Sequence, residues 1–240
     1  MYEERKYRNL FKGNGLQFFD VCICETDLRI GAHRNLYDTA LETVRKYRKQ
    51  IELYIMQYPD FLTSLKPLSP QPGASFIIER MCNASRQADV GPMASVAGAI
   101  SEMVGRHLLN FSDEVIVENG GDIFVKTNKL RRVGIYAGNS PLNQKIGLEI
   151  DPAKTPLGIC TSSGTVGHSL SFGRADAAVV VSPDTFLADA VATAACNMVK
   201  TPGHIENALE FASRIKGVEG IVVIMDDKVG AWGDVKLVSI

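Results

Sequence analysis

Residues 115–125 read VIVENGGDIFV, two short apolar runs joined by a glycine-containing turn. Val115 to Val117 and Ile123 to Val125 both have the apolar, β-branched composition of a strand. Asn119-Gly120 between them is a strong signal for a tight turn, because both residue types accept the positive φ angles that such turns require. The stretch therefore predicts two strands joined by a turn with a Gly-Gly pair at the strand ends.

The segments on both sides of this pair alternate between strand and helix patterns. Toward the N-terminus, Phe18–Ile23 and Leu28–Ile30 are predicted to pair as a hairpin. Apolar residues then recur every three or four positions from Leu36 to Tyr58, which predicts a helix. Helical patterns follow at 76–84 and after Gly91-Pro92. Toward the C-terminus the sequence predicts strands at 133–136, 146–150, 157–160, 177–181, 218–225 and 235–238, and helices at 183–198 and 205–215.

Composition excludes several broad classes of protein. The 240 residues carry 26 Lys and Arg against 27 Asp and Glu, a net charge of −1, so a large basic surface for nucleic acid is not expected. An apolar content of 45% and a charged content of 22% are those of a globular protein and exclude overall disorder. No apolar run approaches the ~18 residues of a membrane-spanning helix, and the charged N-terminal residues show no secretory signal. We therefore expect a cytoplasmic protein.

The five cysteines do not form a disulfide pattern, because their number is odd and they are scattered. Cys22 and Cys24 lie two apart in a strand-like stretch and are expected to share a face. We expect them to be buried or half-buried thiols rather than half of a soft metal site. All five are predicted to be reduced and free of metal.

The Gly-Gly turn is the first candidate binding element. Gly120 and Gly121 leave backbone N–H groups exposed, which suits a phosphate or a flat ring. Asp122 beside them could hydrogen-bond to a ribose or a ring edge. The alternative interpretation is a hairpin turn with no ligand.

A hydroxyl-rich loop follows the predicted strand at 157–160. Residues 161–169 read TSSGTVGHS, and loops at strand ends are where open sheets bind ligands. The alternative is a turn whose hydroxyls bond to its own backbone. His168 in this loop is a candidate acid–base group, since a histidine exchanges protons near neutrality. It could instead cap Ser169 or pack under Phe172.

The third element is the helical segment 187–194, LADAVATA. Asp189 and Thr193 are four residues apart, so both project from one helix face. One carboxylate and one hydroxyl make an oxygen-only pair of the kind that Mg²⁺ accepts. The alternative is an Asp favoured by the helix dipole, with a Thr bonded to a carbonyl one turn back.

Together, the three elements resemble the ApbE superfamily, the FAD:protein FMN transferases. The similarity is densest from Gly91 to Val199, where Gly120–Ile123 and Ala188–Ala194 match closely and Ser162-Ser163-Gly164 stands at the family's Thr-Ser-Gly. The whole chain is more similar to an uncharacterised branch of that superfamily. The marks of that branch are present as Glu25–Leu28, Gly91–Ala94, Glu118–Ile123 and Thr161–Ser169.

The resemblance implies a fold, a metal and a ligand. The expected fold is one ApbE-like α+β domain over residues 1–240, an antiparallel-rich sheet with packed helices. The resemblance assigns Mg²⁺ to Asp189, Thr193 and the main-chain carbonyl near Ala97. It assigns FAD or FMN to a second set of residues, Gly120, Gly121, Asp122, Thr161, Ser162, Ser163 and Gly164. In the family, FMN passes from FAD to a Thr hydroxyl of an acceptor protein.

Two departures separate the chain from the transferases. Their histidine and Asp-Pro-x-Thr-Gly segment are missing, because Ser169–Asp176 runs directly into the next strand. The family also has a Lys-Gly-x-Ala segment ahead of the Gly-Gly-Asp turn, and the position of its Lys is occupied here by Ala97. His168 is the predicted replacement for the missing histidine. Two interpretations stay open, an Mg²⁺-dependent enzyme that transfers or hydrolyses at a dinucleotide pyrophosphate and a flavin- or nucleotide-binding protein without catalysis. A homo-oligomer also stays open.

Overall fold

The hairpin predicted from residues 115–125 lies near the middle of a large antiparallel sheet. The computed structural model describes residues 15–166 and 171–240. In it, β3 (Val115–Asn119) and β4 (Asp122–Lys126) pair through a two-residue turn. The sheet order is β1-β2-β3-β4-β7-β8-β9-β10, and every neighbouring pair is antiparallel. The remaining strands are β1 (Gln17–Ile23), β2 (Thr26–Ala32), β7 (Leu157–Ser162), β8 (Ala177–Ser182), β9 (Gly220–Met225) and β10 (Lys228–Gly233).

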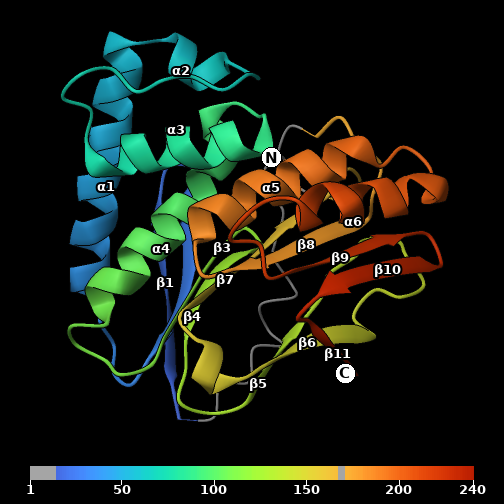
Figure 1. Ribbon diagram of the computed structural model, residues 1–240. Coiled ribbons are helices and arrows are strands. Elements are labelled where there is room, and N and C mark those ends of the chain that lie inside the picture. The colour runs from blue at the N-terminus through green and yellow to red at the C-terminus, as the bar shows by residue number, and fades with distance from the viewer. Residues whose placement is uncertain (1–14, 167–170) are drawn as a thin grey trace.

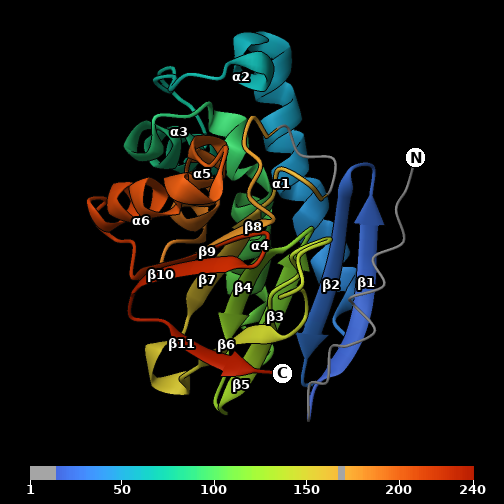
Figure 2. The ribbon, with the colours of Figure 1, turned by 90° about the vertical axis from the view of Figure 1, so that its right-hand side faces the viewer.

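Six α-helices are found among the described residues, and α4, α5 and α6 pack on one face of this sheet (Figures 1 and 2). Helix α4 lies on β3 and β4, α5 on β7 and β8, and α6 on β9. The bounds are α1 (Tyr37–Gln57), α2 (Asp60–Thr63), α3 (Phe76–Ala88), α4 (Val96–Leu108), α5 (Thr185–Met198) and α6 (Ile205–Ser213). Short 3₁₀ turns at Pro92–Ser95, Pro152–Lys154 and Pro202–His204 each begin at a proline, which is tolerated there because its missing N–H would be unpaired anyway.

A second, smaller sheet of order β11-β6-β5 covers the lower part of the other face (Figure 2). Its strands are β5 (Arg131–Gly134), β6 (Ile146–Ile150) and β11 (Lys236–Ser239). The large sheet therefore has two apolar cores, one toward the helices and one toward the small sheet. Strand β8 contributes alternate residues to both, Val180 to the first and Val179 to the second. This two-sided burial confirms the prediction made from its continuous apolar run.

The α+β fold with an antiparallel-rich sheet is confirmed, and the structure adds one strand that the sequence pattern did not show. Strand β10 follows β9 after a tight turn, and the antiparallel ladder of the two strands runs from Lys228 opposite Met225 to Gly233 opposite Gly220. Its sequence, KVGAWG, contains two glycines and is largely exposed. It lies at the sheet edge, so no buried face imposes the alternation of apolar and polar residues that identifies a half-buried strand.

The expectation that Cys22 and Cys24 are buried or half-buried is wrong, because both are exposed. Cys22 lies on the solvent face of β1, between the more buried Val21 and Ile23. Cys24 lies in the β1–β2 turn, where its φ of 50° turns the chain. All five cysteines are free in the structure, and Cys82, Cys160 and Cys196 are buried.

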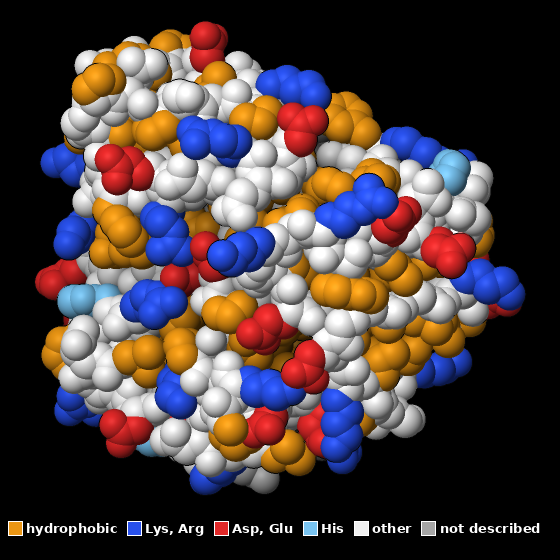
Figure 3. Space-filling model, viewed as in Figure 1, with side chains coloured by type: hydrophobic (Ala, Val, Ile, Leu, Met, Phe, Trp, Pro, Cys, Tyr) orange, Lys and Arg blue, Asp and Glu red, His pale blue; other side chains and the backbone are white. Residues whose placement is uncertain are grey.

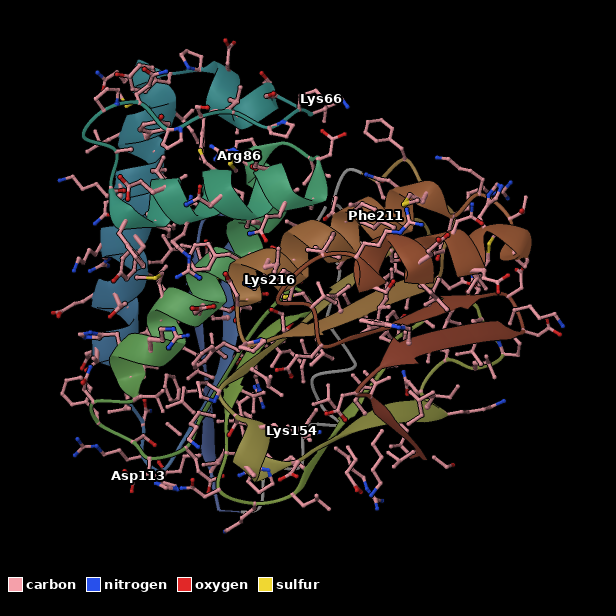
Figure 4. The ribbon with its side chains drawn as sticks, viewed as in Figure 1. Lys66, Arg86, Asp113, Lys154, Phe211 and Lys216 are labelled. Atoms are coloured by element: carbon pink, nitrogen blue, oxygen red, sulfur yellow. The ribbon has the colours of Figure 1, made fainter. Side chains whose placement is uncertain are left out.

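The exterior mixes charges of both signs. On the face shown in Figure 3, basic and acidic side chains are interspersed rather than gathered in one patch. Lys66, Arg86 and Lys216 are exposed charges at the periphery (Figure 4). None of the helices in residues 15–166 and 171–240 is both long and apolar enough to cross a membrane. Against this exterior, carboxylates buried inside the fold need a specific explanation.

Candidate functional site

The Gly-Gly pair forms the β3–β4 turn. Asn119 and Asp122 are directly opposite each other in the ladder, and Gly120 and Gly121 connect them with φ angles of 69° and 108°. Positive φ at both positions is typical of a type I′ two-residue turn, so the predicted hairpin turn is confirmed, while its role in binding stays a prediction. The backbone N–H of Gly121 donates to Oε1 of Glu118 at 3.0 Å. A turn of this kind still presents a flat backbone surface to anything that approaches it.

The hydroxyl-rich loop begins beside this turn. Thr161 and Ser162 are the last two residues of β7, and a Cβ added at Gly121 would lie 3.7 Å from the Thr161 carbonyl oxygen. The two predicted nucleotide-binding elements, the Gly-Gly turn and the hydroxyl-rich loop, are therefore neighbours at the same end of the adjacent strands β4 and β7. Within the loop, Oγ of Ser163 accepts the backbone N–H groups of Thr165 at 3.1 Å and Val166 at 3.0 Å. Ser163 thus satisfies its own turn, as the alternative interpretation required.

Gly164 and the return segment of the loop pack closely together. Its N–H donates to the Ala175 carbonyl at 2.9 Å, and a Cβ at this position would lie only 2.2 Å from the carbonyl oxygen of Gly173. The glycine is therefore required for this close approach of two backbones. His168, the predicted acid–base residue, lies outside the described residues, and its role stays a prediction.

Asp189 of α5 is held by the backbone of α4. Its Oδ2 accepts the N–H of Gly98 at 2.8 Å, across 91 residues of sequence. Asp189 is the fifth residue of α5, which begins at Thr185 and is capped by Asp184 through the Leu187 N–H, so Asp189 is not the residue that caps its own helix. Gly98 also permits the two helices to approach, since a Cβ there would lie 2.5 Å from the Thr185 carbonyl oxygen.

The other two predicted metal-binding groups belong to the same pair of helices. Ala97 lies in the first turn of α4, and its carbonyl oxygen accepts Nδ2 of Asn119 from β3 at 3.1 Å. Thr193 follows Asp189 by one turn of α5 and is half-buried. A carbonyl, a carboxylate and a hydroxyl are thus supplied by the facing helices α4 and α5, which pack against each other. The end of the β3–β4 hairpin adjoins them through Asn119.

Burial makes the two aspartates of this region unusual. It raises the pKa of Asp189 to about 7, although the N–H groups of Gly98 and Ala97 act in the opposite direction. Burial, and next the charge of Asp189, raise the pKa of Asp122 well above its ordinary value. The pKa of the Cys160 thiol is also raised, by burial and then by the charges of Asp122 and Asp189. Three acidic groups, Asp122, Cys160 and Asp189, are therefore grouped in the interior of the fold and perturb one another.

Several positioning residues were missed by reasoning from sequence. Asn119 precedes the Gly-Gly turn and Gly98 follows Ala97, but nothing in the sequence around them predicts which helix or strand they contact. Asp176 was seen only as the residue before a strand. In the structure its Oδ1 accepts the Thr165 hydroxyl at 2.9 Å, and its Oδ2 accepts the Asp226 N–H at 2.8 Å. It therefore ties the hydroxyl-rich loop to the β9–β10 turn.

The segment that replaces the transferase motif runs along the end of α5. The N–H of Phe172 donates to Oδ1 of Asn197 at 2.7 Å, and the N–H of Arg174 donates to the Val199 carbonyl at 2.7 Å. Gly173 lies so close to the Cys196 carbonyl oxygen that a Cβ would be 1.8 Å from it. Asn197 follows Thr193 by one turn on the same face of α5. The helix that carries Asp189 and Thr193 therefore also positions this segment.

Comparison with known proteins places the chain among uncharacterised relatives. The model of the family described as "AbpE bacteria" matches residues 8–230. A UPF0280 protein from Methanococcus aeolicus is 43% identical over 221 residues, covering 90% of this chain and 89% of that protein. A second UPF0280 protein, from Methanocaldococcus jannaschii, is 42% identical with 90% of each chain covered.

Solved structures share the fold at low sequence identity. The ApbE protein from Thermotoga maritima aligns with a TM-score of 0.62 at 10% identity, covering 89% of this chain and 96% of that one. The flavin transferase ApbE from Vibrio cholerae aligns with a TM-score of 0.60 at 12% identity, covering 90% and 96%. The flavinyl transferase ApbE from Pseudomonas stutzeri gives a TM-score of 0.59 at 14% identity.

Proposed function

Because the chain belongs to the family described as "AbpE bacteria", we propose that it binds a flavin nucleotide together with Mg²⁺ at the junction of α4, α5 and the β3–β4 turn. The observation that carries this proposal is the bond from the Gly98 N–H to Asp189, which brings the Ala97 end of α4 to the carboxylate of α5. The flavin transferases of similar fold support the choice of ligand.

The chemistry of the oxygen donors fits Mg²⁺. Asp189 would supply a carboxylate, Thr193 a hydroxyl and Ala97 a carbonyl, all hard oxygen ligands. Among residues 15–166 and 171–240, no three His, Cys, Asp or Glu side chains gather as a metal site. A soft or histidine-rich site for zinc is therefore not supported in this part of the chain. When bound, the cation would neutralise charge on a pyrophosphate.

The chain's own residues would hold the nucleotide. Gly120 and Gly121 would present the backbone surface of their turn to it. Thr161, Ser162, Ser163 and Gly164 would form the adjoining wall, because the loop begins next to Gly121. Asp122, beneath the turn, was assigned to the nucleotide by resemblance. His168 would be the group that moves a proton if a phosphoryl bond is broken.

A second candidate function is flavin or nucleotide binding without catalysis. It is favoured by the segment from Ser171 to Asp176, which follows the end of α5 directly into β8 in place of the transferase motif. The two candidates predict the same complex and differ only in turnover. Transfer to an acceptor protein would in addition require a Thr hydroxyl on that protein.

The test is calorimetric titration of the purified protein with FAD and FMN, with Mg²⁺ or with EDTA. Asp189→Ala should abolish the Mg²⁺-dependent part of the affinity. Asp113→Ala is the matched control, because Asp113 is exposed on the loop before β3 (Figure 4) and should leave the affinity unchanged. Binding that is equal with EDTA, or no binding of either flavin, would overturn the proposal. Chromatography of the same mixtures for FMN and AMP then separates enzyme from binding protein.

A further inference from the structure

Asp122 has a carboxylate oxygen for which the fold supplies no partner. The residue begins β4, is 7% exposed, and its Oδ1 has no hydrogen-bond partner among the described residues. Side chains alternate along a strand, so Asp122 shares a face with Phe124, which lies against Gly105 of α4. Asp122 therefore points toward the helices. A buried carboxylate oxygen without a donor is costly and requires an explanation.

The surroundings of Asp122 supply negative rather than positive charge. Burial first, and then the charges of Asp189 and Glu118, raise its pKa, while hydrogen bonds from the Cys160 side chain and the Thr161 backbone lower it; none of these groups is a cation. Two carboxylates from β4 and α5 thus face a common buried space. Nearby carboxylates repel each other when both are ionised, and a bound cation relieves that repulsion.

The ladder places Asp122 beside a group already assigned to the metal. Asp122 is directly opposite Asn119, whose amide contacts the Ala97 carbonyl at 3.1 Å. The hairpin end is therefore fixed against the first turn of α4. Asp189 is fixed against the same turn through Gly98. The carbonyl of Ala97, the carboxylate of Asp189 and the unpaired oxygen of Asp122 thus come from three elements, α4, α5 and β4, that pack against one another.

We propose that Asp122 is a second carboxylate ligand of the divalent cation, contributed by the β3–β4 hairpin, rather than a contact to the nucleotide. The proposal rests on the function proposed above and extends its ligand set from the two helices to the sheet. With two carboxylates, the site would bind a divalent cation before any nucleotide arrives. More anionic ligands raise the affinity of an oxygen site for such cations.

The test measures the binding of Mn²⁺ alone, by electron paramagnetic resonance of the free ion, to the full chain without nucleotide. Asp122→Asn should weaken Mn²⁺ binding by about tenfold or more. It should also raise the melting temperature of the metal-free protein, because it removes one of two repelling carboxylates. Asp189→Asn should weaken Mn²⁺ binding as strongly, and Asp113→Asn is the surface control.

A second variant keeps the test decisive if Asp122→Asn folds poorly. Asp122→Cys, studied under reducing conditions, replaces a hard ligand by a thiolate that prefers Cd²⁺. The ratio of Cd²⁺ to Mn²⁺ affinity should rise by about tenfold or more over that of the wild type, an effect that a purely structural residue would not produce.

The outcomes separate this proposal from the function on which it rests. Loss of Mn²⁺ affinity in both Asp122→Asn and Asp189→Asn, with the switch toward Cd²⁺ in Asp122→Cys, supports the proposal. Loss in Asp189→Asn alone, with wild-type affinity and metal preference in both Asp122 variants, overturns the proposal and leaves the metal site of α4 and α5 standing. Wild-type affinity in all the aspartate variants overturns both.

Discussion

Gly98 and Asp189 join the two central helices of the site, because the backbone N–H of Gly98 donates to the carboxylate of Asp189 at 2.8 Å. The bond depends on the missing side chain of Gly98. An added Cβ would lie 2.5 Å from the Thr185 carbonyl oxygen and 2.8 Å from Cβ of Asp189. One glycine thus sets the spacing between α4 and α5 and the position of the carboxylate.

Gly98→Ala should push α4 and α5 apart. We expect a loss of about 1–3 kcal/mol in the free energy of unfolding, the usual cost of overpacking, and weaker Mn²⁺ binding. Urea denaturation and Mn²⁺ titration would measure the two effects. Gly203→Ala is the matched control, since its nearest neighbour would be Oγ1 of Thr201 at 3.7 Å. If both variants were equally stable, the close helix contact would not be a constraint.

Metal binding and stability should depend on pH in opposite directions. Burial raises the pKa of Asp189 from 3.8 to about 7. Between these values the folded protein keeps a proton that the unfolded chain has released, so the free energy of unfolding of the metal-free protein should fall as pH rises through this window. A cation requires the ionised carboxylate, so Mn²⁺ affinity should rise over the same window and level off above about 7. Asp189→Asn should remove the pH dependence that this carboxyl causes in both the free energy of unfolding and the Mn²⁺ affinity. If both pH profiles stayed as in the wild type, the assignment of Asp189 as a buried metal ligand would be contradicted.

Asp176→Ala should loosen the hydroxyl-rich loop. The change leaves the Thr165 hydroxyl and the Asp226 N–H without their acceptor, at a cost of about 2 kcal/mol. Amide hydrogen exchange at Asp226 should accelerate, and flavin affinity should fall with it. The neighbouring Asp227 is exposed, so Asp227→Ala should change the stability by less than about 0.5 kcal/mol. Loss of stability without faster exchange at Asp226 would show that Asp176 does not hold this turn.

Asn197→Ala should release the backbone of Phe172. That N–H now donates to Oδ1 of Asn197 at 2.7 Å, and losing the acceptor should cost about 1 kcal/mol. Asn197→Asp retains an acceptor oxygen and should keep the Phe172 amide protected from exchange. Equal protection of this amide in both variants would show that the side chain does not anchor the segment.

Much of the fold followed from local pattern, because strands that are buried on one or both faces must show their periodicity. The hairpin around Gly120 and the continuous run in β8 are clear cases. Strand β10 was not predicted because an exposed edge imposes no such pattern. Cys22 was misplaced because alternation alone does not tell which face of an edge strand meets solvent, and Cys24 because β1 ends before it, at Ile23. At the candidate site, Asp189 was predicted as a ligand from its spacing to Thr193 and from the family's motif. The contacts of Asn119, Gly98 and Asp176 were not found, since each is made to a residue at least 11 positions away and no local rule encodes such a partner.

The bond between Gly98 and Asp189 spans 91 residues, and this separation has a consequence for assembly of the site during folding. Strands β3, β4, β7 and β8 all lie between the two residues in sequence, so the contact of α4 with α5 closes a loop that contains half of the large sheet. Contacts of such long range form only after a large loop of chain has closed. During synthesis, α4 with Ala97 and Gly98 therefore emerges well before α5 with Asp189, and the candidate site is complete only after α5 has been made. A chain cut between residues 98 and 189 would regain the complete site only when both fragments reassociate.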